Sequence, residues 1–253
     1  LARRGRACVS LPGGCNIGDR PIELHLKGLR ALGAEICVER GYVVAEVERL
    51  HGNRIYLGGP FGSTVTGTCN VMCAATLAEG ETIIEAAACE PEVIDLGNML
   101  NAMGAKIEGL GTPFLRIEGV DRLTGVEHSV IPDRIEAGTF LLAAAITRST
   151  LMVAPVISDH LRAVLTKLEE VGCKLQIDGT SVTISADQIN AVDLRTQPFP
   201  GFPTDLQAPF MSLLATASGT SVITENIFEN RLQHVAELQR MGAAIRMQGN
   251  TAF

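Results

Sequence analysis

The segment Leu168–Ser185, "LEEVGCKLQIDGTSVTIS", contains a helix end, a glycine and two strand-like runs in succession. Apolar residues at helical spacing lead into it: Leu161, Val164, Leu165, Leu168 and Val171. Gly172 supplies the left-handed conformation that a helix C-terminus often needs. Apolar and polar residues then alternate around Asp178 and Gly179, which is a strong hairpin signal. We therefore expect a helix that ends at Gly172 and a hairpin that turns at Asp178–Gly179.

The same helix ending occurs four times in the chain, as "LRALGAEI", "LNAMGAKI", "LEEVGCKL" and "LQRMGAAI". The glycines that mark it are 71, 68 and 70 residues apart: Gly33, Gly104, Gly172 and Gly242. A second, Ala-rich helix and a short strand precede three of these endings, in Val71–Glu85, Thr139–Val153 and Pro209–Thr224. These helices are apolar on nearly every side, so we expect them to be buried. The repeating unit is predicted as helix, strand, helix, strand, strand, a mixed α/β architecture.

The first and last units are incomplete. The first lacks most of its buried helix, and the last stops inside its hairpin at Phe253. We expect both ends of the chain to be cut short.

Composition limits the class of protein. The net charge is -7, which argues against a nucleic-acid binder because such proteins need a clustered basic face. Apolar residues make up 46% and Trp is absent, so the core must be aliphatic. Seven cysteines without a dense framework indicate a reduced, cytoplasmic protein. The sequence has no apolar run long enough to predict a membrane span and no signal peptide.

One loop is longer than the repeat requires. The segment from Gly5 to Gly33 has 28 residues, against 24, 23 and 23 in the other units. The extra residues fall in "SLPGGCNIGDRP" (10–21), which contains Cys15 and Arg20. A thiol with a pKa near ~8.5 is mostly protonated at neutral pH and can act as an acid or, once activated, as a nucleophile. Arg20, at the start of the next helix, favours anion binding. An inert cysteine in a turn is the alternative, and the inserted loop favours the functional interpretation.

The other six cysteines give weaker signals for chemistry than Cys15 does. Cys69 and Cys73 are spaced i, i+4, but no further Cys or His completes a metal set, so no metal site is predicted. The remaining four, in apolar contexts, are expected to pack in the core: Cys8, Cys37, Cys89 and Cys173.

Polar residues recur where the buried helix of each unit begins. "FPTDLQAPF" places Asp205 there, as a helix cap or as a general base. "IPDRIEAGTF" places Asp133 and Arg134 at the same point, and "STVTGTCN" (63–70) is the hydroxyl-rich counterpart. We interpret these equivalent ends as parts of one polar ligand site.

Four motifs together resemble one family. "SLPGGCNIGDRPIELH", "IPDRIEAGTF", "FPTDLQA" and "ITENIFENR", in this order over the whole chain, resemble the enolpyruvyl transferases that act as UDP-N-acetylglucosamine 1-carboxyvinyltransferases. The resemblance implies that six repeats form two domains, each an inside-out α/β barrel, with the active site in the cleft between them. Residues 1–131 would be the partial catalytic-loop domain and 132–253 the partial second domain.

The resemblance also implies a reaction and its residues. The enolpyruvyl group of phosphoenolpyruvate would pass to the 3′-hydroxyl of UDP-N-acetylglucosamine with release of phosphate, at the start of peptidoglycan precursor synthesis in the cytoplasm. Cys15 would be the proton donor and Asp205 the base at the sugar hydroxyl. Substrate contacts would come from Arg20, Pro21, Ile22, Glu23, Leu24, Thr64, Val65, Thr66, Asp205 and Ile227, and cleft-lining residues would be Asp133 and Arg134. The family implies neither a cofactor nor an obligate protein partner.

The chain departs from the family pattern at the diphosphate. Thr64–Val65–Thr66 stands where many members have Ser-Val-Gly, and Gly62 stands where some have Lys, so the contacts there are expected to differ. A Lys-Asn pair and an Arg of the family lie outside these residues, so we expect the chain alone to be inactive. Two alternatives stay open: a 5-enolpyruvylshikimate-3-phosphate synthase, which would lack the cysteine loop, and a non-catalytic scaffold that binds nucleotide sugar.

Overall fold

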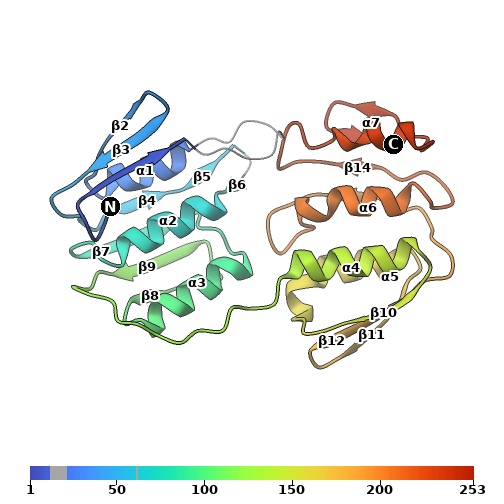
Figure 1. Cartoon of the computed structure of the whole chain (residues 1–253), viewed down its shortest axis with the longest axis horizontal. Coiled ribbons are helices and arrows are strands. Elements are labelled where there is room, and N and C mark those ends of the chain that lie inside the picture. The colour runs from blue at the N-terminus through green and yellow to red at the C-terminus, as the bar shows by residue number, and fades with distance from the viewer. Residues whose placement is uncertain (12–21, 61) are drawn as a thin grey trace. The chain divides into compact units, whose positions relative to one another are not determined.

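The described residues fold into two compact units, each with its own hydrophobic cluster (Figure 1). The computed structural model describes residues 1–11, 22–60 and 62–253. The first unit contains the described residues up to Ile131, and the second contains Pro132–Phe253.

The first unit contains two main sheets. In the smaller, order β1-β3-β2, every pairing is antiparallel, and β2 and β3 are joined by a turn in which Arg40 and Gly41 have φ of 49° and 81°. The larger has the order β4-β7-β9-β8, with β4 parallel to β7. The elements are β1 (Arg6–Ser10), α1 (Glu23–Ala31), β2 (Glu35–Glu39), β3 (Tyr42–Glu46), β4 (Arg54–Tyr56), β5 (Gly58–Gly59), β6 (Gly62–Ser63), α2 (Val65–Ala75), β7 (Glu81–Glu85), α3 (Pro91–Ala102), β8 (Lys106–Glu108) and β9 (Phe114–Glu118).

The second unit repeats this plan. One sheet has the antiparallel order β10-β12-β11, and the other has the order β13-β14-β16-β15, with β13 parallel to β14. The elements are α4 (Arg134–Ile146), β10 (Thr150–Val153), the 3-10 turn η1 (Ser158–Leu161), α5 (Arg162–Glu170), β11 (Lys174–Asp178), β12 (Ser181–Ser185), β13 (Leu194–Arg195), the 3-10 turn η2 (Thr204–Leu206), α6 (Gln207–Leu214), β14 (Ile223–Thr224), α7 (His234–Arg240), β15 (Met247–Gln248) and β16 (Thr251–Ala252).

The four glycine helix endings are confirmed. Gly33, Gly104, Gly172 and Gly242 have φ of 100°, 103°, 102° and 99°. After α5, the N–H of Gly172 donates to Glu169 O at 2.9 Å and the N–H of Cys173 donates to Leu168 O at 3.0 Å. This pair of bonds is the Schellman motif, which satisfies carbonyls at the helix end and turns the chain into the next strand. The same two bonds follow α1, α3 and α7.

The predicted hairpin is also confirmed, with its turn one residue later. Asp178 and Ser181 are partners in the ladder, so the turn residues are Gly179, with φ of 56°, and Thr180. A glycine with positive φ at the first turn position matches the right-handed twist of the flanking strands.

The predicted order helix, strand, helix, strand, strand is confirmed in α2–β9, α4–β12 and α6–β16. Sequence patterns missed β4 and β13, which pair in parallel with the first strand of the following unit. The strands of the described residues form five separate sheets, and a closed barrel is not seen among them.

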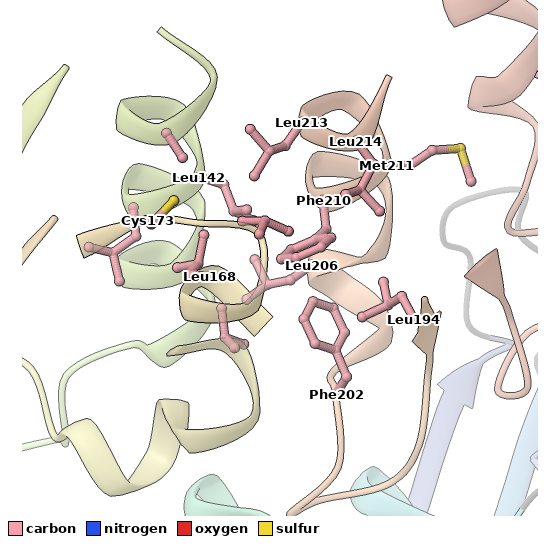
Figure 2. Packing of buried hydrophobic residues seen from close by; sticks show 14 of the residues in the cluster. Leu142, Leu168, Cys173, Leu194, Phe202, Leu206, Phe210, Met211, Leu213 and Leu214 are labelled. Carbon is pink, nitrogen blue, oxygen red and sulfur yellow. The ribbon is translucent and has the colours of Figure 1, made fainter. Parts of the chain in front are cut away.

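The inner faces of α2, α4 and α6 are buried, as predicted, although α2 and α4 keep some exposed residues and α6 some half-buried ones. The core of the first unit is aliphatic, as expected. The second core is not wholly aliphatic, because Phe202 and Phe210 pack edge to face with their ring centroids 5.3 Å apart. Figure 2 shows these two rings next to one another, with Leu206 beside them and Leu194 close by. Burial of two aromatic rings contributes strongly to a core of this size.

Candidate functional site

Three predicted residues lie outside the described part of the chain: Cys15, Arg20 and Pro21. Their roles stay predictions.

The first group of described site residues lies at the start of α1. Ile22 is the N-cap of this helix and Glu23 its first residue, so the carboxylate is placed where the helix dipole favours negative charge. Leu24 lies against β5, since a Cβ on Gly59 would be only 3.2 Å from Leu24 Cδ1. Glycine at position 59 thus lets this strand approach the first turn of α1.

The second group lies at the start of α2. Thr64 is the N-cap, and its hydroxyl accepts a hydrogen bond from the N–H of Gly67 at 3.2 Å. Val65 and Thr66 lie in the first turn, where backbone N–H groups have no partner within the helix. An uncharged helix N-terminus of this kind can bind a phosphate through N–H groups and hydroxyls.

His25 joins the two groups. Its Nδ1 accepts from Nδ2 of Asn70 at 2.8 Å, which leaves the ring hydrogen on Nε2, 3.3 Å from the hydroxyl of Thr66. Burial lowers the pKa of His25, so the imidazole is the neutral form that this pattern requires. The two helices can approach closely because Gly28 has no side chain. A Cβ at this position would lie only 2.2 Å from the Val71 side chain of α2. The structure therefore brings Ile22–Leu24 and Thr64–Thr66 together, which sequence spacing alone did not show.

The backbone conformation of Gly62, just before α2, bears on its difference from the family members that have Lys at this position. Its φ is 106°, a conformation that only glycine adopts without strain. A lysine at this position would need a different loop conformation.

Asp133 and Arg134 begin α4 in the second unit. Asp133 is the N-cap, and its carboxylate accepts from the N–H groups of Ile135 at 2.7 Å and Glu136 at 3.1 Å. The guanidinium of Arg134 lies 5.5 Å from the centre of the Phe199 ring, a cation–π distance. Asp133 thus has a structural role that accounts for its position.

Asp205 does not cap a helix. It lies in η2, and the N-cap of α6, Leu206, makes no side-chain cap hydrogen bond. The Oδ1 atom of Asp205 instead accepts from Nη2 of Arg231 at 2.6 Å, and the Arg231 guanidinium lies 5.3 Å from the Phe228 ring centre. The Asp205 side chain is 54% exposed, so this carboxylate is accessible to a ligand.

Ile227 is connected to the same site through Glu225. The N–H of Ile227 donates to Glu225 Oε1 at 2.8 Å, and the hydroxyl of Thr204, next to Asp205, donates to Glu225 Oε2 at 2.9 Å. The motif "ITENIFENR" predicts no role for Glu225 or Arg231. A carboxylate between Thr224 and Asn226, directly after an apolar strand-like run, was the available signal.

The cysteine predictions are only partly confirmed. Cys173 is buried, but Cys8 and Cys37 are exposed, because they flank Val44 on the outer face of the β1-β3-β2 sheet. Burial is the main cause that raises the pKa of Cys69 to about 11, and the neighbouring Cys73 is the second cause. Burial also raises the pKa of Cys73. Both are therefore mostly protonated at neutral pH. The described residues contain no cluster of three or more His, Cys, Asp or Glu side chains that could hold a metal.

No described helix is both long enough and apolar enough to cross a membrane.

Comparison with protein families gives a match over the whole chain. The family described as EPSP synthase (3-phosphoshikimate 1-carboxyvinyltransferase) matches residues 1–253.

This chain belongs to the EPSP synthase family.

Relatives within this family refine the similarity. The chain is 60% identical to a UDP-N-acetylglucosamine 1-carboxyvinyltransferase of Prochlorococcus marinus (strain MIT 9313) and 52% identical to one of Halothermothrix orenii. Both alignments cover 100% of this chain, but only 58% and 60% of the relatives. This member of the EPSP synthase family thus spans about three fifths of the length of the curated relatives it matches.

Solved structures support the fold. The enolpyruvyl transferase NikO from Streptomyces tendae superposes with a TM-score of 0.86 at 21% identity, covering 99% of this chain and 60% of that one. EPSP synthase from Acinetobacter baumannii gives a TM-score of 0.67 at 21% identity, covering 97% and 59%. The mixed α/β fold is therefore the enolpyruvyl transferase fold, as predicted.

Proposed function

We propose that this chain is part of an enzyme that transfers the enolpyruvyl group of phosphoenolpyruvate to the 3′-hydroxyl of UDP-N-acetylglucosamine. This is the committed reaction of peptidoglycan precursor synthesis. The observation that carries the proposal is the 60% identity, over the whole chain, to a UDP-N-acetylglucosamine 1-carboxyvinyltransferase. The side-chain geometry supports it, because Glu225 accepts hydrogen bonds both from Ile227 and from Thr204, the residue before Asp205, and so brings two residues predicted to contact one substrate near each other.

Each residue has a chemical task in this proposal. The thiol of Cys15 gives a proton to the methylene carbon of phosphoenolpyruvate, while Asp205 takes the proton of the sugar hydroxyl whose oxygen adds to C2. The tetrahedral adduct then loses a proton from the new methyl group together with phosphate, and this restores the vinyl group. Arg20 and the first turn of α1 bind the donor anion and the nucleotide sugar. No cofactor is needed in this scheme.

The architecture is part of the proposal. We propose that residues 1–131 and 132–253 belong to two enolpyruvyl transferase domains, each an inside-out α/β barrel built from repeats of about 70 residues. A cytoplasmic location agrees with seven cysteines that form no dense disulfide framework in the sequence. We propose no obligate protein partner.

The test uses the complete protein, with whatever residues flank this chain. Phosphate release should require both phosphoenolpyruvate and UDP-N-acetylglucosamine, and mass spectrometry should show the enolpyruvyl sugar nucleotide. Shikimate 3-phosphate as acceptor tests the 5-enolpyruvylshikimate-3-phosphate alternative, and it should give no product. The Cys15→Ser variant should fold and lose turnover. Normal phosphate release by that variant would contradict the role of Cys15, and binding of the nucleotide sugar without any transfer would favour a scaffold.

A further inference from the structure

Glu225 is a buried carboxylate surrounded by hydrogen-bond donors. It is 2% exposed and lies directly after β14. Its Oε1 accepts from the N–H groups of Ile227 at 2.8 Å and Phe228 at 3.2 Å, and from the hydroxyl of Thr196 at 2.9 Å. Its Oε2 accepts from the hydroxyl of Thr204 at 2.9 Å. A buried charge is costly unless its lone pairs are satisfied, and these four bonds satisfy them.

The four donors belong to three segments of the chain: Thr196 directly after β13, Thr204 in η2, and the loop that follows β14. Thr204 is the residue before Asp205, in η2. Ile227 and Phe228 belong to the loop after β14, which also presents Arg231 to Asp205. Thr196 strengthens the connection, because its hydroxyl accepts from the N–H of Asn226 at 2.8 Å. Glu225 therefore holds η2 and this loop in one fixed arrangement.

The repeat provides an internal comparison for Glu225. Gly80, Ser149 and Gly219 mark the same turn in three units, and the sixth residue after each is Ala86, Pro155 or Glu225. Two units thus build the same strand end without a carboxylate. The scaffold alone does not require Glu225, which indicates a task specific to this site.

We propose that Glu225 is a positioning residue that fixes the base Asp205 relative to the sugar-nucleotide contact Ile227. This inference rests on the proposed function. Glu225 does not itself touch substrate, because its four hydrogen bonds occupy both oxygens and its side chain is buried. It acts through the Thr204 hydroxyl on one side and through two backbone N–H groups on the other.

Two variants separate positioning from folding in the complete protein. Thr204→Val removes only the hydrogen bond from the Thr204 hydroxyl to Glu225, next to Asp205 in the chain. Glu225→Leu removes all four hydrogen bonds. Glu225→Gln is the conservative variant, since its carbonyl can accept from both N–H groups while its amide donates to the Thr204 hydroxyl. The matched control is Ser212→Ala, which removes another half-buried hydroxyl of this unit, bonded to Ala208 O at 3.0 Å.

We expect Thr204→Val to lower kcat/KM for UDP-N-acetylglucosamine about tenfold, the size of one lost hydrogen bond, while KM for phosphoenolpyruvate stays within about twofold. Glu225→Leu should lose more, and Glu225→Gln should recover most of the activity. Amide exchange at Ile227 and Phe228 should become faster in Glu225→Leu but not in Thr204→Val.

Unchanged kcat/KM for UDP-N-acetylglucosamine in Thr204→Val, or a large rise in KM for phosphoenolpyruvate, would overturn the positioning role. So would unchanged amide exchange in a folded Glu225→Leu protein. A wild-type protein without any transfer activity would refute the proposed function instead, and amide exchange would still decide whether Glu225 anchors the loop.

Discussion

Arg231 holds Asp205 by a hydrogen-bonded ion pair, with Nη2 2.6 Å from Oδ1. Arg231 is 19% exposed and Asp205 54% exposed at the side chain, so the pair lies at the border of the second unit's core. The guanidinium thus points one carboxylate oxygen in a fixed direction and leaves the carboxyl group accessible.

Asp205→Asn should separate catalysis from stability. Loss of a general base lowers kcat by about 10²–10⁴-fold, whereas loss of a partly exposed ion pair costs less than about 1 kcal/mol of unfolding free energy. Steady-state kinetics and urea unfolding of the complete protein measure the two effects. Asp159→Asn is the control, because it breaks an exposed pair with Arg162 and should change neither quantity. A kcat within a few-fold of wild type would exclude Asp205 as the base.

Thiol labelling should distinguish the cysteines. Burial raises the pKa of Cys173 to about 11, and burial is also the main cause of the similar pKa of Cys69. Since the thiolate is the reactive form, iodoacetamide labelling of both should be slow at pH 7 and should rise as the pH approaches 11. Exposed Cys8 and Cys37 should label first among the described cysteines. Peptide mass spectrometry over a pH series gives the order.

The epoxide fosfomycin should label Cys15 selectively, and faster when UDP-N-acetylglucosamine is present. The Cys15→Ser variant should then take up no label. Label spread over all seven cysteines would count against a special reactivity of Cys15.

His25 should make stability depend on pH. Burial lowers the pKa of His25 below its usual value near 6.5, so the unfolded chain takes up a proton before the folded protein does. The unfolding free energy therefore falls as the pH drops through about 6.5 and levels off below the folded pKa. Urea unfolding at pH 7.5 and 5.5 should show a smaller difference for His25→Gln than for wild type.

The helix-ending glycines should differ in their tolerance of a side chain. Gly172 and Gly242 have nearly the same φ, so alanine at either should cost about 1–2 kcal/mol of unfolding free energy. A Cβ at Gly172 would also lie 2.9 Å from Gln188 O, whereas Gly242 has nothing within 4 Å. Gly172→Ala should therefore be more destabilising by about 1 kcal/mol, as in other overpacked sites. Equal melting curves for the two variants would contradict this reading of the contact.

Local signals predicted the repeat, and non-local contacts were missed. A glycine after an apolar helix determines its own conformation, so Gly33, Gly104, Gly172 and Gly242 could be read from sequence. The strands β4 and β13 could not, because two or three residues gain strand geometry only by pairing with a segment about thirty residues away. Cys8 and Cys37 were misplaced because a cysteine next to apolar strand residues looks buried whichever face of the sheet is covered.

The candidate site shows the same division. Motifs predicted site residues at the starts of α1, α2, α4 and η2. Their partners could not, since His25 reaches Asn70 across 45 residues and Thr204 reaches Glu225 across 21. Hydrogen bonds between distant segments leave no periodic trace in a sequence, and the hypothesis that Asp205 caps a helix was wrong for this reason.

The stacking of Arg231 on Phe228 gives the second unit a place for an optical probe. The chain has no Trp, so an indole at position 228 would be its sole strong fluorophore. It would lie close to the Arg231 guanidinium that holds Asp205, since the native Phe228 ring centre is 5.3 Å from that guanidinium. A ligand that draws Arg231 or Asp205 away would change the emission of that indole, so binding could be followed in real time without any turnover.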